Sequence, residues 1–81
     1  MLNKIEESNE KVEIIEELVN ELEVNYSFVK KHKKLFIKYA NVTFKLKSYK
    51  LIPLQNKELK RQATLILIQA KILMELKELC K

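Results

Sequence analysis

His32 and Cys80 carry the side chains best suited to chemistry in this 81-residue chain. A thiol beside an imidazole can act as a nucleophile–base pair, and both groups are common zinc ligands. The chain has one residue of each type, whereas a zinc site needs three or four converging ligands. Cys80 also lies next to the last residue, where chain ends fray. We therefore expect neither a catalytic nor a metal site, and we interpret His32 as a histidine at the edge of the core.

The residue composition also argues against an enzyme. The chain has no Gly and a single Arg, so it can form neither a glycine-rich phosphate loop nor a cluster of arginines around a substrate. We expect a non-enzymatic protein with no cofactor and no small-molecule substrate.

A lysine-rich run at residues 28–50 is the strongest remaining candidate for binding. It holds eight lysines, His32, five aromatic residues and no acidic residue. Basic side chains interleaved with aromatics can contact phosphates and stack on bases. The chain lacks a helix-turn-helix glycine, zinc-finger spacing and an RNA-recognition motif, so nucleic-acid binding would be independent of base sequence. The residues that would carry such polyanion binding are Lys30, Lys33, Lys47, Lys50, Lys57, Lys60 and Arg61.

The distribution of charge favours a simpler interpretation, in which the lysines form a solvated face. Residues 1–24 contain eight glutamates and two lysines, whereas residues 25–52 contain eight lysines and no acidic residue. Blocks of opposite charge in one chain tend to pair with each other. An antiparallel arrangement of these two segments pairs glutamates with lysines, namely Glu21 with Lys31 and Glu7 with Lys45.

The elements that position these residues are predicted to be three helices. Apolar residues recur every three or four positions in each segment, which is the period of an amphipathic helix. The helices are expected over residues 2–24, 27–51 and 54–80. Two short runs compete with this interpretation, because 42–47 alternates with period two and 64–68 is rich in β-branched residues, as strands are.

The junctions between the helices are predicted from local signals. The apolar face changes phase near residues 24–27, where Asn25 or Ser27 can cap a new helix. A tight turn there makes the first two helices an antiparallel αα-hairpin, although one continuous helix remains the alternative. Pro53 ends the second helix, because the residue before a proline avoids the α region.

Each predicted helix has an apolar face. The face of the first helix consists of Ile5, Ser8, Val12, Ile15, Val19 and Leu22, with Ile14 and Leu18 beside it. The face of the second consists of Phe28, His32, Leu35, Tyr39, Val42, Leu46 and Tyr49. The third helix is apolar over more than half of its circumference, so it must pack against two neighbours or another chain.

The sequence thus predicts an all-α, single-domain protein, a three-helix bundle of an αα-hairpin and a third, strongly apolar helix. One copy cannot bury every apolar side chain, so we expect an oligomer or a protein partner. A non-enzymatic interaction module is the favoured function, and nucleic-acid binding is the alternative. The residues assigned to the protein interface are Ile37, Phe44, Leu65, Leu67, Ile68, Ile72, Leu76 and Leu79.

Two features of the sequence indicate the cellular compartment of the protein. A lone cysteine fits a reducing compartment, and the longest apolar run, residues 63–76, is too short and too polar to span a bilayer. The basic amphipathic segment 28–50 has the composition of a membrane-surface helix, but the core needs that helix. We therefore expect a cytoplasmic protein that does not bind membranes.

Overall fold

The computed structural model describes residues 4–49 and 55–80, and for residues 4–7 it describes the backbone alone. The described residues form four helices, namely α1 (Lys4–Leu22), α2 (Tyr26–Lys31), α3 (Lys33–Tyr49) and α4 (Asn56–Leu79). Within the described ranges there is no strand, and segments 42–47 and 64–68 are helical. The all-α prediction is confirmed, and the strand alternative for both segments is wrong.

The turn between α1 and α2 is built on Glu23, which adopts a positive φ of 55°. The N–H of Glu23 donates to the carbonyl of Asn20, and the N–H of Val24 donates to the carbonyl of Val19, at 3.3 Å each. This pairing is a Schellman motif, which usually places glycine at the left-handed position. Asn25 then caps α2, because its side-chain oxygen accepts the N–H of Phe28 at 3.1 Å. The predicted turn is confirmed, and the two segments are not one continuous helix.

The second predicted helix is divided at His32, so the expectation of a single helix over 27–51 is wrong. His32 leaves helical geometry with φ −116° and ψ 35°, and its carbonyl accepts the N–H groups of Leu35 and Phe36. Lysines at 30, 31, 33 and 34 surround the break, and like charges three or four residues apart weaken a regular helix. Residues 50–54, including Pro53 and its predicted role, lie outside the described residues.

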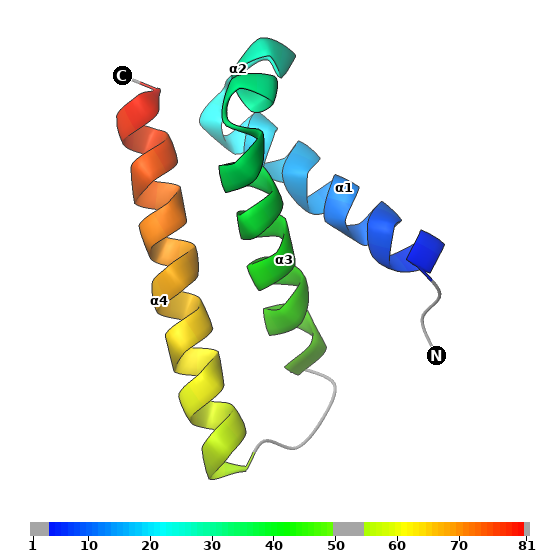
Figure 1. The fold of residues 1–81 in the computed structure, drawn as a ribbon, viewed down its shortest axis with the longest axis vertical. Helices are drawn as coiled ribbons and strands as arrows, with labels where there is room; N and C mark the ends of the chain where they lie inside the picture. Colours follow the sequence, from blue (N-terminus) through cyan, green and yellow to red (C-terminus); the bar gives the residue numbers. More distant parts are fainter. Residues whose placement is uncertain (1–3, 50–54, 81) are drawn as a thin grey trace.

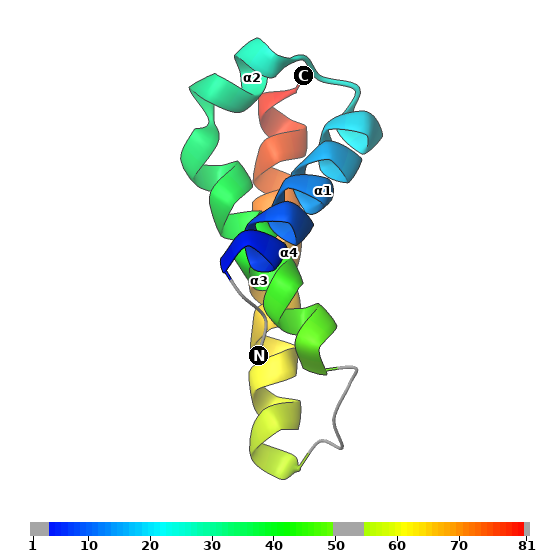
Figure 2. The ribbon, with the colours of Figure 1, turned by 90° about the vertical axis from the view of Figure 1, so that its right-hand side faces the viewer.

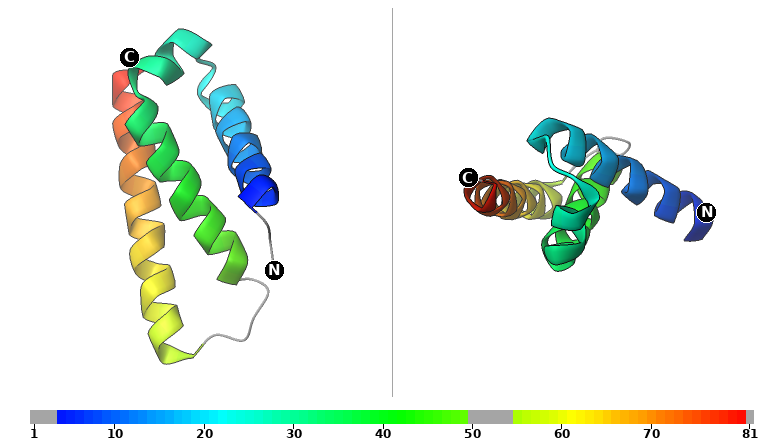
Figure 3. Two further views of the ribbon diagram at one scale, coloured as in Figure 1. Left: turned by 45° about the vertical axis from the view of Figure 1, so that its right-hand side comes forward. Right: turned by 90° about the horizontal axis from the view of Figure 1, so that it is seen from above.

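Helix α3 lies between α1 and α4 (Figures 1 and 2), and each of these two helices packs against it. Toward its N-terminus α1 leans away from α4, as the view from above shows (Figure 3). The short α2 covers the upper end of the molecule beside the C-terminal half of α1 (Figure 1). The body is correspondingly flat, with extents of 39 × 27 × 18 Å.

The core forms where the three long helices converge. Leu18 of α1, Phe36 of α3, and Ile72 and Leu76 of α4 make one buried cluster, in which Leu76 is fully enclosed. The ring of Phe28 from α2 packs edge-on against Phe36, with 6.0 Å between the ring centres. Burial of these large apolar side chains supplies most of the stabilisation of so small a domain.

Two of the predicted apolar faces are rotated relative to the real ones. On α1 the buried residues are Ile14 and Leu18, whereas Val12, from the centre of the predicted face, is exposed. On α3 the most buried residues are Phe36 and Ala40, which lie beside the predicted face. The cause on α3 is that it contacts a helix on each side, so the residues between the two contacts are the most enclosed.

Of the two ion pairs predicted between the first two helices, the one between Glu21 and Lys31 does not form. Among the described side chains no ion pair joins Glu21 to Lys31, and both residues are exposed. The pair Glu7–Lys45 lies outside the described residues, because the side chain of Glu7 is not described. Long charged side chains at an exposed surface gain little from pairing. Within the described ranges, none of the helices has both the length and the apolar content that crossing a bilayer requires.

Candidate functional site

The structure separates the residues assigned to the protein interface. Ile72 and Leu76 belong to the core, and Ile68 packs against it. Leu65 and Phe44 are half-buried, the latter beneath the amine of Lys11, whose nitrogen lies 5.5 Å from the ring centre. The exposed members are Ile37, Leu67 and Leu79. Ile72 and Leu76 therefore serve the fold of this chain and are not accessible to a partner.

An apolar groove of about 380 Å³ lies between α1 on one side and α2 and α3 on the other. Its first wall is made by Val12, Ile15 and Glu16 of α1. Its second wall and floor are made by Tyr26, Val29, Lys30, Lys33, Phe36 and Ile37. We call this feature the α1–α3 groove. Although α1 packs against α3, Val12 of α1 and Ile37 of α3 are only partly covered at this place.

The lining of the groove is accessible to another molecule. Val12, Tyr26 and Ile37 are 51%, 76% and 43% exposed, although all three are large apolar or aromatic side chains. A second hollow of about 300 Å³ extends the groove along α1 to Val19 and Asn20. Such an elongated, open and apolar channel between helices has the character of a helix-binding groove.

Charges at the rim of the groove are asymmetric. Lys30 and Lys33 line one side, and Glu16 lies on the opposite wall. Two of the residues assigned to polyanion binding are thus placed beside an apolar channel, where their charge can select the partner that enters.

A second apolar surface follows the outer side of α4. Six exposed apolar residues share an arc about 100° wide, namely Leu59, Ala63, Ile66, Leu67, Ala70 and Met74. We call them the outer stripe. Leu67 and Met74 are each 67% exposed, although both are among the largest apolar side chains of the helix. The stripe lies on the side of α4 away from the core residues Ile72 and Leu76.

Sequence reasoning assigned only Leu67 of this stripe to an interface. The signal that distinguishes the two sides of α4 is side-chain size. The core side carries Leu65, Ile68, Ile72 and Leu76, whereas the outer side includes two alanines, which bury little area.

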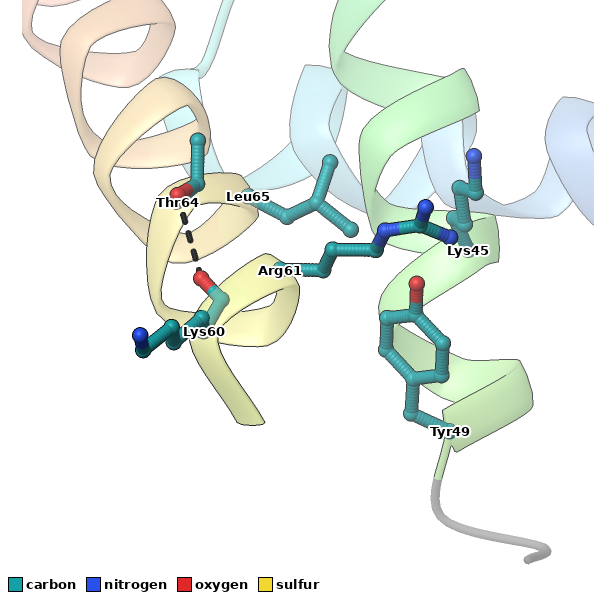
Figure 4. Close-up of a pocket in the computed structure, with 6 residues that line it drawn as sticks. All are labelled: Lys45, Tyr49, Lys60, Arg61, Thr64 and Leu65. Carbon is teal, nitrogen blue, oxygen red and sulfur yellow. Dashed lines mark hydrogen bonds between the residues drawn. The ribbon is translucent and has the colours of Figure 1, made fainter. Parts of the chain in front are cut away.

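A basic pocket of about 250 Å³ lies between the C-terminal part of α3 and the N-terminal part of α4. Arg61 extends from α4 toward Lys45 and the hydroxyl of Tyr49 on α3, whereas Lys60 points away from them (Figure 4). The hydroxyl of Thr64 donates a hydrogen bond to the carbonyl of Lys60 at 3.0 Å (Figure 4). Lys47 lines a neighbouring hollow, Lys57 is exposed at the start of α4, and Lys50 lies outside the described residues. Positive charge therefore gathers at this end of the molecule.

A polar contact joins α3 to α4 in the middle of their interface. The amide of Gln69 donates to the hydroxyl of Thr43 at 2.8 Å. Nearby, partial burial raises the pKa of Tyr39 above its ordinary value; a hydrogen bond with Thr43 acts in the opposite direction, and the carboxylates of Glu21 and Glu17 add to the increase. The hydrogen bond between Gln69 and Thr43 helps to align α3 with α4, and sequence periodicity does not predict it because both residues interrupt apolar faces.

Among the described residues, no hydrogen bond joins His32 to Cys80. His32 packs against the ring of Phe28, with ring centres 4.6 Å apart, and Cys80 is an exposed thiol at the end of α4. In the part of the chain that the structure describes, no three His, Cys or Glu side chains converge as metal ligands.

The arrangement as a whole provides two exposed apolar surfaces and one basic pocket. Each lies at a different place on the helices, and none contains a cluster of reactive groups. No protein family, no curated protein sequence and no solved structure matches this chain.

Proposed function

We propose that this chain is a non-enzymatic protein–protein interaction module, a small adaptor, assembly factor or regulator that acts through apolar helix faces. Its helical bundle combines the αα-hairpin of α1 to α3 with the apolar α4. The α1–α3 groove is the observation that carries the proposal, because it exposes Val12, Tyr26 and Ile37 in one continuous channel. Contiguous exposed apolar residues usually mark a binding surface.

The exposed surface of the whole chain supports the same conclusion. The chain exposes 6622 Å², whereas a compact monomer of 9.7 kDa exposes about 5,100 Å² by the usual scaling with mass. The flat arrangement around α3 contributes to this excess, since α1 and α4 cover little of each other. A partner that buried part of the excess would supply core that a domain of this size lacks.

The partner we propose for the groove is an amphipathic helix of another protein that carries acidic residues beside its apolar face. The apolar side chains would enter between α1 and α3, as in other helix-in-groove complexes. The acidic residues would face Lys30 and Lys33 at the rim. Because exposed charge pairs are screened, added salt should weaken the complex without abolishing it.

A photoreactive side chain at Ile37 tests this proposal in the cells that make the protein. We expect a cross-linked protein whose attachment site lies on an amphipathic, acidic helix. The same reactive group at Lys71 of α4 is the matched control, and it should not give this product. Val12→Glu should abolish the product, because it places a charge inside the groove. Identical products from both positions, or a product that survives Val12→Glu, would contradict groove binding.

A second function, sequence-independent binding of a polyanion, is supported by the basic pocket at the α3–α4 end. The proximity of Arg61 to Lys45 places two cations together without an acidic neighbour in the pocket lining. In this case a gel-shift assay with mixed-sequence DNA should show binding that weakens steeply as salt rises. Arg61→Glu should weaken that binding, whereas Lys77→Glu, the same type of charge reversal at the other end of α4, should have less effect.

A further inference from the structure

We propose that the outer stripe of α4 binds the same stripe of a second copy in antiparallel orientation. The stripe consists of Leu59, Ala63, Ile66, Leu67, Ala70 and Met74, and all six are exposed. The proposal concerns a surface that shares no residue with the α1–α3 groove, so each can fail without the other.

The order of residues along the stripe is self-complementary. The six positions lie symmetrically about the midpoint between Ile66 and Leu67. A two-fold axis at this midpoint places Leu59 opposite Met74, Ala63 opposite Ala70 and Ile66 opposite Leu67 of the other copy. Large side chains then meet large ones, and small ones meet small ones. The facing alanines allow the two helices to approach closely, since the distance between packed helices depends on the residues at the contact.

Charge favours the antiparallel orientation over the parallel one. Lys57 and Lys60 lie in the first part of α4, and Glu75 lies in its last part, on the same side of the stripe. In a parallel pair, both lysines would lie about 22 Å or more from Glu75 of the other copy along the helix axis. In the antiparallel pair, both lysines come within two residues of Glu75 of the other copy. Antiparallel helices also place their dipoles head to tail.

The size of the stripe determines the affinity we expect. From Leu59 to Met74 the stripe covers about 22 Å of helix, at about 1.5 Å per residue. One helix pair of this length buries less area than a standard protein interface, which is about 1,600 Å². The dimer should therefore dissociate in the micromolar range, on the order of 10 µM.

Dimerisation through α4 would leave the α1–α3 groove open on both copies, because α1, α2 and α3 make its lining. The protein would then present two identical grooves on one assembly. A dimeric module of this kind holds two partner molecules together, and its avidity depends on the self-association of α4.

Sedimentation of the full chain over roughly 1 to 500 µM, which spans the expected dissociation constant, tests the dimer. The wild-type chain should change from monomer to dimer across this range. Leu67→Glu places two carboxylates near the two-fold axis and should raise the dissociation constant by about 100-fold or more. Thr64→Glu adds the same charge to an exposed site beside the stripe and should leave dimerisation nearly unchanged. Circular dichroism of all three proteins verifies that helix content is retained.

Cysteine cross-linking tests the orientation, with Cys80→Ser as the background. Leu59→Cys alone should not cross-link, because the two thiols lie about 22 Å apart along an antiparallel pair. A mixture of the Leu59→Cys and Met74→Cys proteins should form a mixed disulfide. Self-cross-linking of Leu59→Cys would indicate parallel helices and overturn the proposal.

Two further results would also overturn it. One is a wild-type chain that remains monomeric throughout the concentration range. The other is a monomer that binds neutral phospholipid vesicles and loses this binding in Leu67→Glu, because the stripe would then face lipid. Loss of the dimer with unchanged cross-linking from Ile37 would leave the groove proposal intact.

Discussion

The α1–α3 groove and the outer stripe of α4 are both apolar and exposed, but they arise in different ways. The groove is concave, and its walls come from three helices, so its shape depends on how those helices pack. The stripe is convex and belongs to one helix, so its shape follows from helical periodicity alone. A regular convex stripe can be matched by a copy of itself, whereas a concave channel needs a partner of complementary shape. The two surfaces are therefore suited to different kinds of partner.

The largest effect should come from the core that both surfaces share. Phe36→Ala removes a side chain that is 1% exposed and should lower the free energy of unfolding by about 3–5 kcal/mol. Most of the stability of so small a domain would be lost, and both surfaces with it. Urea unfolding followed by circular dichroism measures the change. Ile37→Ala, at an exposed neighbour on the groove wall, should cost far less, and equal losses would mean that Phe36 is not central.

Charges placed on each surface should separate the two contacts. Val12→Glu should weaken groove binding by about 10-fold or more, while the dissociation constant of the dimer stays the same. Leu67→Glu should do the reverse, because the two residues lie on different helices and share no neighbour. Cross-linking from Ile37 and sedimentation, applied to both variants, provide the comparison. If either variant impaired both contacts, the two surfaces would be coupled.

The turn that positions α1 should respond to a glycine. Glu23→Gly relieves a positive φ in a residue with a side chain and should raise the free energy of unfolding by about 0.5–1 kcal/mol. Glu21→Gly, two residues earlier and inside α1, should lower it by about 1 kcal/mol. Thermal unfolding of both variants measures the difference. Glu23 positions α1 and not α4, so Glu23→Gly should leave dimerisation through α4 unaffected. If Glu23→Gly and Glu21→Gly changed the free energy of unfolding in the same direction, backbone strain at Glu23 would be excluded.

Charge reversal on α4 should have a smaller effect on the dimer alone. Lys60→Glu should weaken self-association by about two- to five-fold, and adding Glu75→Lys should restore most of it. Sedimentation at low and high salt tests this, since the difference should shrink as salt rises. An additive loss in the double variant would exclude this pairing and favour a parallel or unrelated contact.

The smallest effect concerns Tyr39 of α3 and appears only at high pH. The pKa of Tyr39 is raised in the folded protein, so the folded state holds the phenolic proton more tightly than the unfolded state. This contribution to stability is complete below about pH 10 and is lost as the pH rises through the folded-state pKa. Tyr39→Phe should therefore lose less stability than wild type as the pH rises above about 10. If the free energy of unfolding had the same pH dependence in both proteins, Tyr39 would not contribute to it.

The local signals in the sequence predicted the secondary structure well. The phase change near residue 25 and the capping side chain of Asn25 located the turn, because both depend on neighbouring residues alone. The break at His32 was missed, since no Gly or Pro marks it. What marks it is the group of lysines around His32, and the effect of such repulsion depends on what the helix packs against.

The sides of the helices that are buried could not be read from periodicity. Val12 and Leu18 both belong to apolar faces of α1, but only Leu18 meets the core. On α4 the apolar arc is wide enough that Ile72 was assigned to an interface, although it is buried. The packing of α1 and α4 on two sides of α3 decides these cases, and it is a property of the whole chain.

The position of α3 between its two neighbours also determines how the molecule should open. Since α1 rests mainly on α3, its detachment exposes Ile14 and Leu18 but leaves the contact of α3 with α4 in place. Amide protons of α1 should therefore exchange with deuterium before those in the middle of α3 and α4. Local unfolding would then begin with the detachment of α1. The same motion would widen the α1–α3 groove for a partner helix.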